Sequence, residues 1–287
     1  MEKFQIFFQL TRLNKPIGFM LLFWPCAWGL TLAFYFNSKT DLYLKYLILF
    51  FLGSILMRTA GSIFNDIVDK DFDKKVERTK ERPIASGKIS TFSAFLYVIL
   101  FCLIALVILL QFNVLTIVLG ASSMILAFSY PFMKRITYWP QLFLGLTFNW
   151  GIIIGWPSIT NSISIEPIIL YLSAIFWTLG YDTIYGIQDM RDDEIIGVKS
   201  TSIKFVNNIK LFVGACYGLC ILFILVLCIM MEINKYFLLL SILFILTLVY
   251  QIIIFRTDNP KSCHSAFKIN NLTGGLIFLL ISSFTIS

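Results

Sequence analysis

The sequence is organised in runs of about 20 mostly apolar residues, roughly the length that an α-helix needs to cross a bilayer. Hydrophobic residues make up 58% of the 287 positions and charged residues only 14%, whereas a soluble domain is roughly half apolar and a quarter charged. A soluble protein of this composition would expose too much apolar surface. We therefore predict an all-α, polytopic membrane protein with nine transmembrane helices. The predicted spans cover residues 17–36, 44–64, 92–112, 114–133, 139–157, 167–186, 210–231, 236–256 and 268–287.

Lysine and arginine residues indicate the orientation of these spans, because short loops rich in them stay on the cytoplasmic side. Of the 23 such residues, 19 lie before the first span or near the loops that follow even-numbered spans. Lys39, Lys45 and Lys235 lie on the opposite side, and Arg58 lies within the second span. The N-terminus is therefore predicted to be cytoplasmic. The net charge of +7 describes one membrane face, which can meet anionic lipid or an anionic substrate, and not a nucleic-acid-binding surface.

Other features of the chain exclude some kinds of site. The six cysteines form no Cys-x-x-Cys pair, and Cys216 and Cys220, one helical turn apart, are predicted to be packing residues. The single histidine, His264, is predicted to lie in a loop and is too isolated for a metal site. No obligate protein partner is evident. The polar start carries no cleavable signal and does not resemble a transit peptide, which favours a bacterial inner membrane over a mitochondrial inner membrane.

Acidic residues are concentrated in two clusters on the predicted cytoplasmic side. Of the 16 Asp and Glu residues, 11 lie in NDIVDKDFDKKVERTKERPIASG, residues 65–87, and in YDTIYGIQDMRDDE, residues 181–194. Each cluster follows an even-numbered span. Carboxylates at membrane depth are costly and usually mark a functional site. The alternative is that these are solvated loop charges, which the adjacent Lys and Arg side chains neutralise.

The spacing within each cluster favours a metal site. If the second span continues as a helix, Asn65, Asp69 and Asp73 share one face, with Asp66 beside them. Like charges at this spacing repel, so the stripe needs a counter-ion. Oxygen ligands with no His or Cys nearby suit Mg²⁺, which commonly binds a few carboxylates together with substrate phosphates. The second cluster follows a similar stripe, made of Asp182, Tyr185, Asp189 and Asp193.

Basic residues near the clusters could bind phosphate. Arg58 lies within the second span about two turns before Asp66, and a charge at that depth needs an anionic partner. Arg78, Arg82 and Lys134 could reach the same place. Guanidinium forks and ammonium groups both bind phosphate oxygens. The sequence thus predicts that acidic residues hold a metal and basic residues hold phosphate at the mouth of an apolar cavity.

A diphosphate whose remainder occupies an apolar cavity in a membrane is most naturally an isoprenoid diphosphate. Mg²⁺ and the cations would stabilise the departing pyrophosphate. The allylic carbocation left behind would need a nucleophile. The tyrosines at the span ends, Tyr130, Tyr181 and Tyr185, could stabilise this cation through their ring faces.

Several segments carry a resemblance to a known family. NDIVDKDFD fits the N-D-x-x-D-x-x-x-D motif of the UbiA-type intramembrane prenyltransferases, and YDTIYGIQDMRDD fits their second Asp-rich motif. Further matching segments follow one another along nearly the whole chain: RLNKPIGF, MRTAGSIFND, ERPIASG, SYPFMKR, GVKST and AFKINN. Together they resemble the 4-hydroxybenzoate polyprenyltransferase branch. Residues 1–287 are accordingly predicted to form a single UbiA-type membrane domain.

The resemblance implies a fold and a reaction. The helices would surround a central cavity with a lateral opening to lipid, and two Mg²⁺ ions would bind there. The reaction would be Mg²⁺-dependent transfer of a polyprenyl group from an all-trans polyprenyl diphosphate to C3 of 4-hydroxybenzoate, an early membrane step of ubiquinone biosynthesis. The partners would be these two substrates and membrane lipid.

The resemblance also assigns residues to substrate binding. Arg58, Arg78 and Lys134 would contact phosphate oxygens. Arg135 would contact the carboxylate of the aromatic acid, although Lys134 and Arg135 could exchange roles. The tyrosines in the substrate site would be Tyr130 and Tyr185.

Metal binding and catalysis are assigned in the same way. The catalytic residues would be Asp69, Asp189 and Arg58. Asp189 could also orient the phenol or accept the proton that the ring loses. The metal ligands would be Asn65, Asp66, Asp69, Asp73, Asp182, Asp189 and Asp193.

Two other kinds of function are alternatives. UbiA-type relatives use other acceptors, such as homogentisate, dihydroxynaphthoate, haem or a glycerol phosphate lipid. A secondary transporter with nine spans could also gather charge at a membrane mouth, but transporters usually place coupling charges near the bilayer midplane on broken helices. Here the acidic residues lie at span ends on one side, which favours the enzyme.

Overall fold

The chain is almost entirely helical over the residues that the structure, a computed structural model, describes: 2–37, 40–231 and 235–286. Within these ranges, nine helices are long and apolar enough to cross a membrane, which confirms the predicted all-α, polytopic class. They are α2 (Ile17–Phe36), α3 (Thr40–Val68), α5 (Thr91–Leu109), α6 (Val114–Ile136), α7 (Pro140–Thr160), α8 (Ile165–Gly186), α11 (Ile209–Ile229), α12 (Lys235–Ile254) and α13 (Pro260–Ser283).

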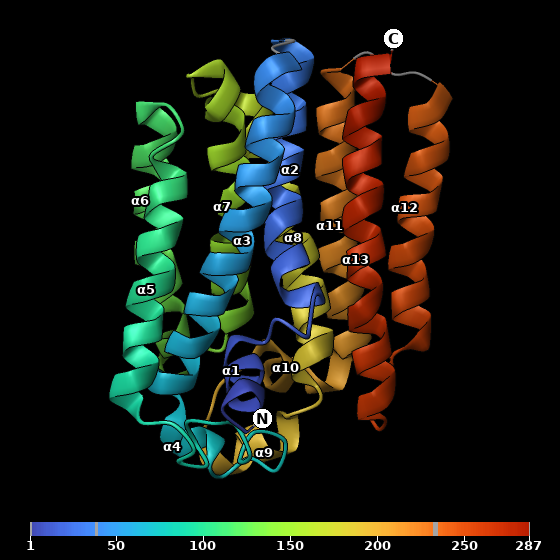
Figure 1. Cartoon of the computed structure of the whole chain (residues 1–287). Coiled ribbons are helices and arrows are strands. Elements are labelled where there is room, and N and C mark those ends of the chain that lie inside the picture. Colours follow the sequence, from blue (N-terminus) through green and yellow to red (C-terminus); the bar gives the residue numbers. More distant parts are fainter. Residues whose placement is uncertain (1, 38–39, 232–234, 287) are drawn as a thin grey trace.

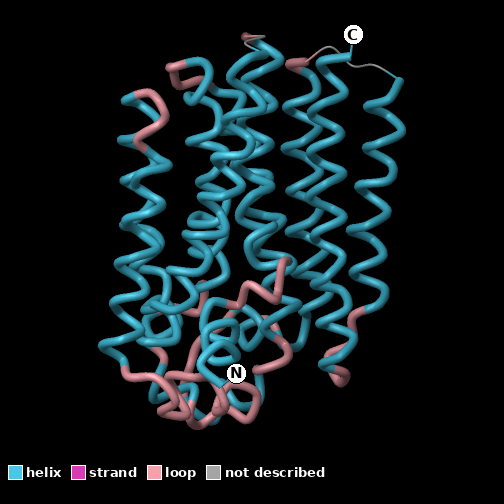
Figure 2. Tube along the Cα trace, in the orientation of Figure 1, coloured by secondary structure: helices cyan, strands magenta, loops and turns pink. Residues whose placement is uncertain are grey.

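The long helices stand side by side, and most short helices gather at one end of the bundle together with the N-terminus (Figure 1). Much of the loop structure lies at this loop-rich end as well (Figure 2). The end of α13 lies at the opposite end, as an odd number of crossings requires. The short helices are α1 (Glu2–Thr11), α4 (Lys70–Asp73), α9 (Met190–Ile196), α10 (Thr201–Lys204), and the 3₁₀ turns η1 (Val206–Asn208) and η2 (Phe284–Ile286).

The cytoplasmic placement of the N-terminus stays a prediction. The basic residues of the loop-rich end agree with it. Of the residues expected on the other side, Lys39 lies outside the described ranges, and the side chain of Lys235 is not described.

α13 begins at Pro260, earlier than the predicted start at residue 268. The Asn259 side chain caps it by accepting hydrogen bonds from the amides of Lys261 (3.1 Å) and Ser262 (3.4 Å), and Pro260 occupies the first helical position. The first turns are polar, so hydropathy alone placed the start too late. His264 therefore lies in a helix, and its predicted placement in a loop was wrong.

α1 packs on the loop-rich end of α3, although this helix was not predicted from the sequence. Leu10 is fully buried in an apolar cluster with Ala60, Ile63 and Val98. α1 ends beside Arg12, which adopts the left-handed conformation with φ 55°. Because α1 packs here through its buried face, the RLNKP segment that follows it lies at the same end of the bundle as the acidic clusters.

Small residues let α2 and α7 approach each other closely. A Cβ atom on Gly155 would lie 2.6 Å from the carbonyl oxygen of Cys26 and 2.8 Å from the amide nitrogen of Leu30. Such packing is a main source of helix association in a membrane, where lipid is as apolar as the side chains. On α2, Trp28 is fully buried, and its indole donates a hydrogen bond to the carbonyl of Gly274 in α13 (3.0 Å). α2 therefore joins α7 to α13.

Gly155→Ala should lower the melting temperature of the purified protein in detergent. The added methyl group must push two helix backbones apart, which costs about 1–3 kcal/mol. Gly218→Ala in α11 is the matched control, because a Cβ there meets no atom within 4 Å and alanine favours a helix. A Gly155 variant that melts at or above the wild-type temperature would contradict the close packing of α2 and α7.

Candidate active site

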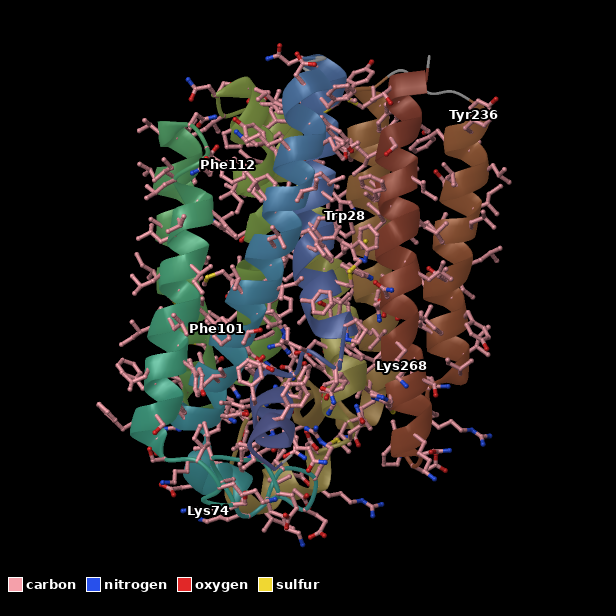
Figure 3. All side chains as sticks on the ribbon, in the orientation of Figure 1. Trp28, Lys74, Phe101, Phe112, Tyr236 and Lys268 are labelled. Atoms are coloured by element: carbon pink, nitrogen blue, oxygen red, sulfur yellow. The ribbon has the colours of Figure 1, made fainter. Side chains whose placement is uncertain are left out.

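One large cavity of about 1860 Å³ joins a polar region at the loop-rich end to a long apolar region. The apolar wall includes α5 residues from Phe95 to Leu109 and then Phe112, and the helical part of this stretch is about 20 Å long. Phe112 lies near the end of the bundle opposite the loops, and Phe101 lies between the two ends (Figure 3). The cavity can therefore hold an amphiphile with a charged head and a long apolar tail.

The first acidic cluster keeps its helical phase, although α3 ends at Val68 and α4 starts at Lys70. The amide of Asp69 donates to the carbonyl of Asn65 (2.9 Å), and the amide of Asp73 donates to the carbonyl of Asp69 (2.8 Å). Asn65, Asp69 and Asp73 all line the cavity. The structure thus brings these three residues together as the sequence predicted.

Asp69 is held by Lys134, and one of its oxygens has no hydrogen bond. Lys134 Nζ and Asn65 Nδ2 (2.9 Å) both donate to Asp69 Oδ2. Within the described ranges, the buried Oδ1 accepts no hydrogen bond, and Arg135 Nη2 lies 3.8 Å from it. Leaving a buried carboxylate oxygen unsatisfied is costly. Such an oxygen is also the ligand type that a hard cation uses.

Asp66 does not line the cavity and is buried in a network of charges. Arg12 and Arg82 both donate to Asp66 Oδ1, Arg82 from 3.0 Å. Arg82 also donates to the two oxygens of Asp73, over 3.1 and 2.9 Å. Burial raises the pKa of Asp73, and the charge of Arg82 only partly offsets this rise. The network ties α1 to the first cluster.

Arg78 links the first cluster to the second. Its Nε donates to Asp189 Oδ1 (2.6 Å) and its Nη2 donates to Asp189 Oδ2. The guanidinium also lies 5.8 Å from the centre of the Tyr185 ring. Burial, together with the neighbouring charge of Asp189, raises the pKa of Asp193 to about 7. The two predicted clusters therefore meet at the mouth of one cavity.

Arg58 and Asp182 line the same cavity from within α3 and α8. Arg58 Nη1 donates to Ser62 Oγ, and the guanidinium lies 5.6 Å from the centre of the Phe148 ring. In the part of the chain that the structure describes, the buried Arg58 Nε makes no hydrogen bond. The cavity wall also contains the predicted tyrosines, namely Tyr130, Tyr181 and Tyr185.

Arg135 lies at the edge of the site, whereas its neighbour Lys134 lines the cavity. Arg135 Nη2 donates to the backbone carbonyl of Val68 (2.6 Å), and its guanidinium lies 4.9 Å from the centre of the Phe72 ring. Successive residues of a helix point in different directions. The end of α6 therefore offers one of these two cations to the cavity, and that cation is Lys134.

The carboxylates face cations instead of converging on one point. In the described ranges, no three His, Cys, Asp or Glu residues lie close enough together to form a metal site. The reason is that carboxylates repel one another and are attracted to nearby Arg and Lys. The donors still fit Mg²⁺, because they are oxygens and Asp69 Oδ1 has free lone pairs. Mg²⁺ usually needs only one or two carboxylates, with waters and substrate phosphates completing its shell.

Arg12 and Lys15 line the cavity, although neither was predicted from the sequence to be a site residue. They lie in RLNKPIGF, directly before the first span. The available clue was charge: a buried Asp66 needs a cation, and the basic residues before the first span lie on the same predicted face. The pairing itself depends on where α1 packs.

Comparison with known proteins adds to this geometry. The profile of the UbiA prenyltransferase family matches residues 22–272. The chain belongs to the UbiA prenyltransferase family. The profile covers most of this UbiA-family chain. That residues 1–287 form a single domain stays a prediction.

Several curated relatives carry the name "4-hydroxybenzoate polyprenyltransferase, mitochondrial". The Arabidopsis thaliana protein is 50% identical over 212 residues, which cover 74% of this UbiA-family chain and 52% of the relative. The Bos taurus protein is 43% identical over 281 residues, covering 96% of the chain and 74% of the relative. The chain spans about half the length of several such relatives.

Solved structures of UbiA homologs share the fold. The apo structure of a homolog from Aeropyrum pernix gives a TM-score of 0.77 at 22% identity, covering 91% of this chain and 96% of that one. A homolog from Archaeoglobus fulgidus bound to DMAPP and Mg²⁺ gives a TM-score of 0.72 at 17% identity, covering 97% and 98%. At these identities the likeness establishes the arrangement of helices.

In EDTA, the protein should become more stable as the pH falls from about 8 to about 6. The pKa of Asp193 is about 7 in the folded chain and about 3.9 in an unfolded one. The folded state therefore binds a proton that the unfolded state lacks, and this stabilisation is lost as the pH rises through about 7. Melting temperatures across this range check the slope, which Asp193→Asn should flatten. Asp192→Asn should flatten it less, because the charge of Asp192 makes only a small contribution to the raised pKa of Asp193. Equal slopes in wild type and Asp193→Asn would contradict the prediction.

Proposed function

We propose that the chain transfers a polyprenyl group from an all-trans polyprenyl diphosphate to C3 of 4-hydroxybenzoate, with Mg²⁺ as cofactor, as an early membrane step of ubiquinone biosynthesis. The observation that carries this proposal is a single cavity whose mouth combines two acidic clusters with phosphate-binding cations and whose remainder is apolar. The names of the curated relatives support the acceptor. The bound DMAPP and Mg²⁺ of the Archaeoglobus fulgidus homolog support the donor and the metal.

The metal would bind between the two acidic clusters. When bound, Mg²⁺ would neutralise diphosphate charge and stabilise the departing pyrophosphate. Asp66 is less well placed as a metal ligand. It does not line the cavity, and its Oδ1 already accepts hydrogen bonds from Arg12 and Arg82. The cavity-lining ligands we propose are Asn65, Asp69, Asp73, Asp182, Asp189 and Asp193.

Arg78, Arg82 and Lys134 are proposed to bind the outer oxygens of the diphosphate. Each forms an ion pair with a carboxylate at the mouth, so a bound diphosphate would exchange one anionic partner for another. Guanidinium groups offer planar forks and the ammonium group a point charge. As the carbon–oxygen bond of the donor breaks, these cations stabilise the charge that collects on pyrophosphate.

Carbon–carbon bond formation would follow in the adjacent part of the cavity. The rings of Tyr130, Tyr181 and Tyr185 line the cavity and would stabilise the allylic cation through their faces. The cation forms a bond with C3 of 4-hydroxybenzoate, and the proton on C3 is then lost. We assign proton acceptance to Asp189, with Asp182 as the second cavity-lining candidate.

The carboxylate of the acceptor needs a cation inside the cavity. Arg135 was predicted for this role, but it lies against Val68 and Phe72 at the edge of the site. Arg58 lines the cavity, and its buried Nε has no partner within the described residues. We therefore assign the acceptor carboxylate to Arg58, in place of its predicted contact with phosphate.

Arg58→Gln should raise the KM for 4-hydroxybenzoate about 10- to 100-fold, because a charged hydrogen-bond donor to the carboxylate is lost. The KM for the prenyl diphosphate should change much less. Steady-state kinetics with each substrate varied in turn checks this, with Arg135→Gln as the matched control. The assignment is wrong if Arg135→Gln, and not Arg58→Gln, produces the selective rise.

Asp189→Ala should abolish prenyl transfer, because the variant lacks both a proposed metal ligand and the proposed proton acceptor. Asp192→Ala is the control, since Asp192 lies in α9, the short helix that Asp189 precedes, but does not line this cavity. Product formation by both variants is measured in the same membranes. Near-normal turnover by Asp189→Ala would exclude both roles.

The direct test of the function is prenyl transfer in membranes that contain the protein. Radiolabelled 4-hydroxybenzoate and a long-chain all-trans prenyl diphosphate are supplied with Mg²⁺ or with EDTA. We expect a lipophilic product that depends on Mg²⁺ and is absent with Asp69→Ala. Homogentisate and dihydroxynaphthoate are tested in parallel, and product from one of these alone would replace the acceptor. No product with any acceptor, from protein that folds and binds prenyl diphosphate, would contradict the proposal.

We propose the bacterial inner membrane as the location of the protein. The multi-pass architecture supports an integral membrane protein. The relatives named mitochondrial make the mitochondrial inner membrane the alternative. Fractionation of the source cells with an antibody to the chain decides between them.

A further inference from the structure

Positive charge is distributed unevenly around the mouth of the cavity. Near the acidic clusters, four cavity-lining cations form ion pairs with carboxylates, as in the pairs Arg78–Asp189 and Lys134–Asp69. Arg58, within α3, instead donates to Ser62. On the α13 side, four cavity-lining basic residues form no ion pair in the part of the chain that the structure describes. We call these four residues the α13 rim: Lys15, Lys261, His264 and Lys268.

Three members of the α13 rim form a stripe along one helix. Lys261, His264 and Lys268 follow each other at i, i+3 and i+7, so they share one face of α13. Asn271 extends this face, and it accepts a hydrogen bond from the indole of Trp24 in α2 (3.0 Å). The polar stripe is about 15 Å long, and Lys268 lies on α13 above the loop-rich end of that helix (Figure 3). Lysines at such depth need an anionic or aqueous partner.

The fourth member, Lys15, adds to the same positive field. Partial burial lowers the pKa of Lys15, and the charges of Arg12, Arg78 and Arg82 lower it further, with Asp66 opposing them. The charged groups that act on His264 are Lys268, Lys15 and Arg78, all of them cations. An anion placed beside the rim would therefore be stabilised from several directions.

We propose that the α13 rim is an outer binding position for a diphosphate group. The diphosphate would be either the head of an isoprenoid diphosphate on its way to the inner site or the pyrophosphate that leaves it. Several basic groups suit a multiply charged anion better than the single phosphate of a common phospholipid. Ile17, Phe19 and Leu22 of α2 line the cavity as well and offer an apolar surface for a tail. The proposal rests on the proposed function, which supplies the diphosphate.

The outer position differs from the inner one in its need for metal. The inner site contains carboxylates that repel a diphosphate unless a cation intervenes. The four side chains of the α13 rim are basic, and in the described ranges none of them forms an ion pair with a carboxylate. The rim therefore binds diphosphate without Mg²⁺, and salt weakens this binding because the charges are exposed.

The test measures equilibrium binding by protein in phosphatidylcholine nanodiscs, in EDTA and without acceptor. The probes are radiolabelled geranylgeranyl thiodiphosphate, which does not react, and radiolabelled inorganic pyrophosphate. Lys261→Gln/Lys268→Gln should weaken binding about tenfold and flatten its salt dependence. Lys74→Gln/Lys75→Gln is the matched control, because it removes two neighbouring charges at the loop-rich end outside the cavity lining (Figure 3). Lys261→Arg/Lys268→Arg should bind like wild type.

The two probes distinguish the two sources of the diphosphate. Weaker binding of the thiodiphosphate alone assigns the rim to the incoming substrate, and weaker binding of pyrophosphate alone assigns it to the product. An equal loss of affinity for the two probes means that the α13 rim accepts both the incoming substrate and the product. The proposal is overturned if wild type and the Lys261→Gln/Lys268→Gln variant bind both probes equally, or if wild type binds neither probe in EDTA. Failure of wild type to bind the thiodiphosphate even with Mg²⁺ would instead contradict the proposed function.

Discussion

Charge pairing at one end of an apolar bundle is the interaction on which the rest of the structure depends. Unpaired carboxylates beside a membrane would be costly. Here Asp66 and Asp69 meet cations from other segments, and Asp73 meets Arg82 within its own segment. These contacts also assemble the site. They join α1 to α3, α6 to α3, and the loop after α4 to the segment after α8, through the pairs Arg12–Asp66, Lys134–Asp69 and Arg78–Asp189.

The same pairing explains how one site can hold both a metal and a diphosphate. Removing a single partner from a buried ion pair is strongly destabilising, whereas exchanging partners keeps the charges balanced. A substrate that brings phosphate to the cations, together with a metal for the carboxylates, offers such an exchange. The unsatisfied Oδ1 of Asp69 and the free Nε of Arg58 within the described residues are the groups that gain most. The cavity therefore favours a charged head over a neutral one.

Much of this could be predicted from the sequence, because membrane spans and acidic motifs are local patterns. Long apolar runs predicted the spans, and helical spacing predicted that Asn65, Asp69 and Asp73 share a face. Where polar residues begin a span, hydropathy failed, as at α13, whose capped polar start contains His264. The choice between adjacent cations depends on the rotation of α6 and could not be made from the sequence. The partner of Asp66 depends in turn on where α1 packs.

The most direct measurement is an experimental structure of the protein with a prenyl thiodiphosphate and Mg²⁺. We expect Lys134 to leave Asp69 and Arg78 to leave Asp189, where Arg78 Nε and Asp189 Oδ1 are 2.6 Å apart. Both cations should then contact phosphate oxygens. Asp69 and Asp189 would then face the metal. Intact Lys134–Asp69 and Arg78–Asp189 pairs, with the diphosphate bound elsewhere, would contradict the exchange of partners and the site built on it.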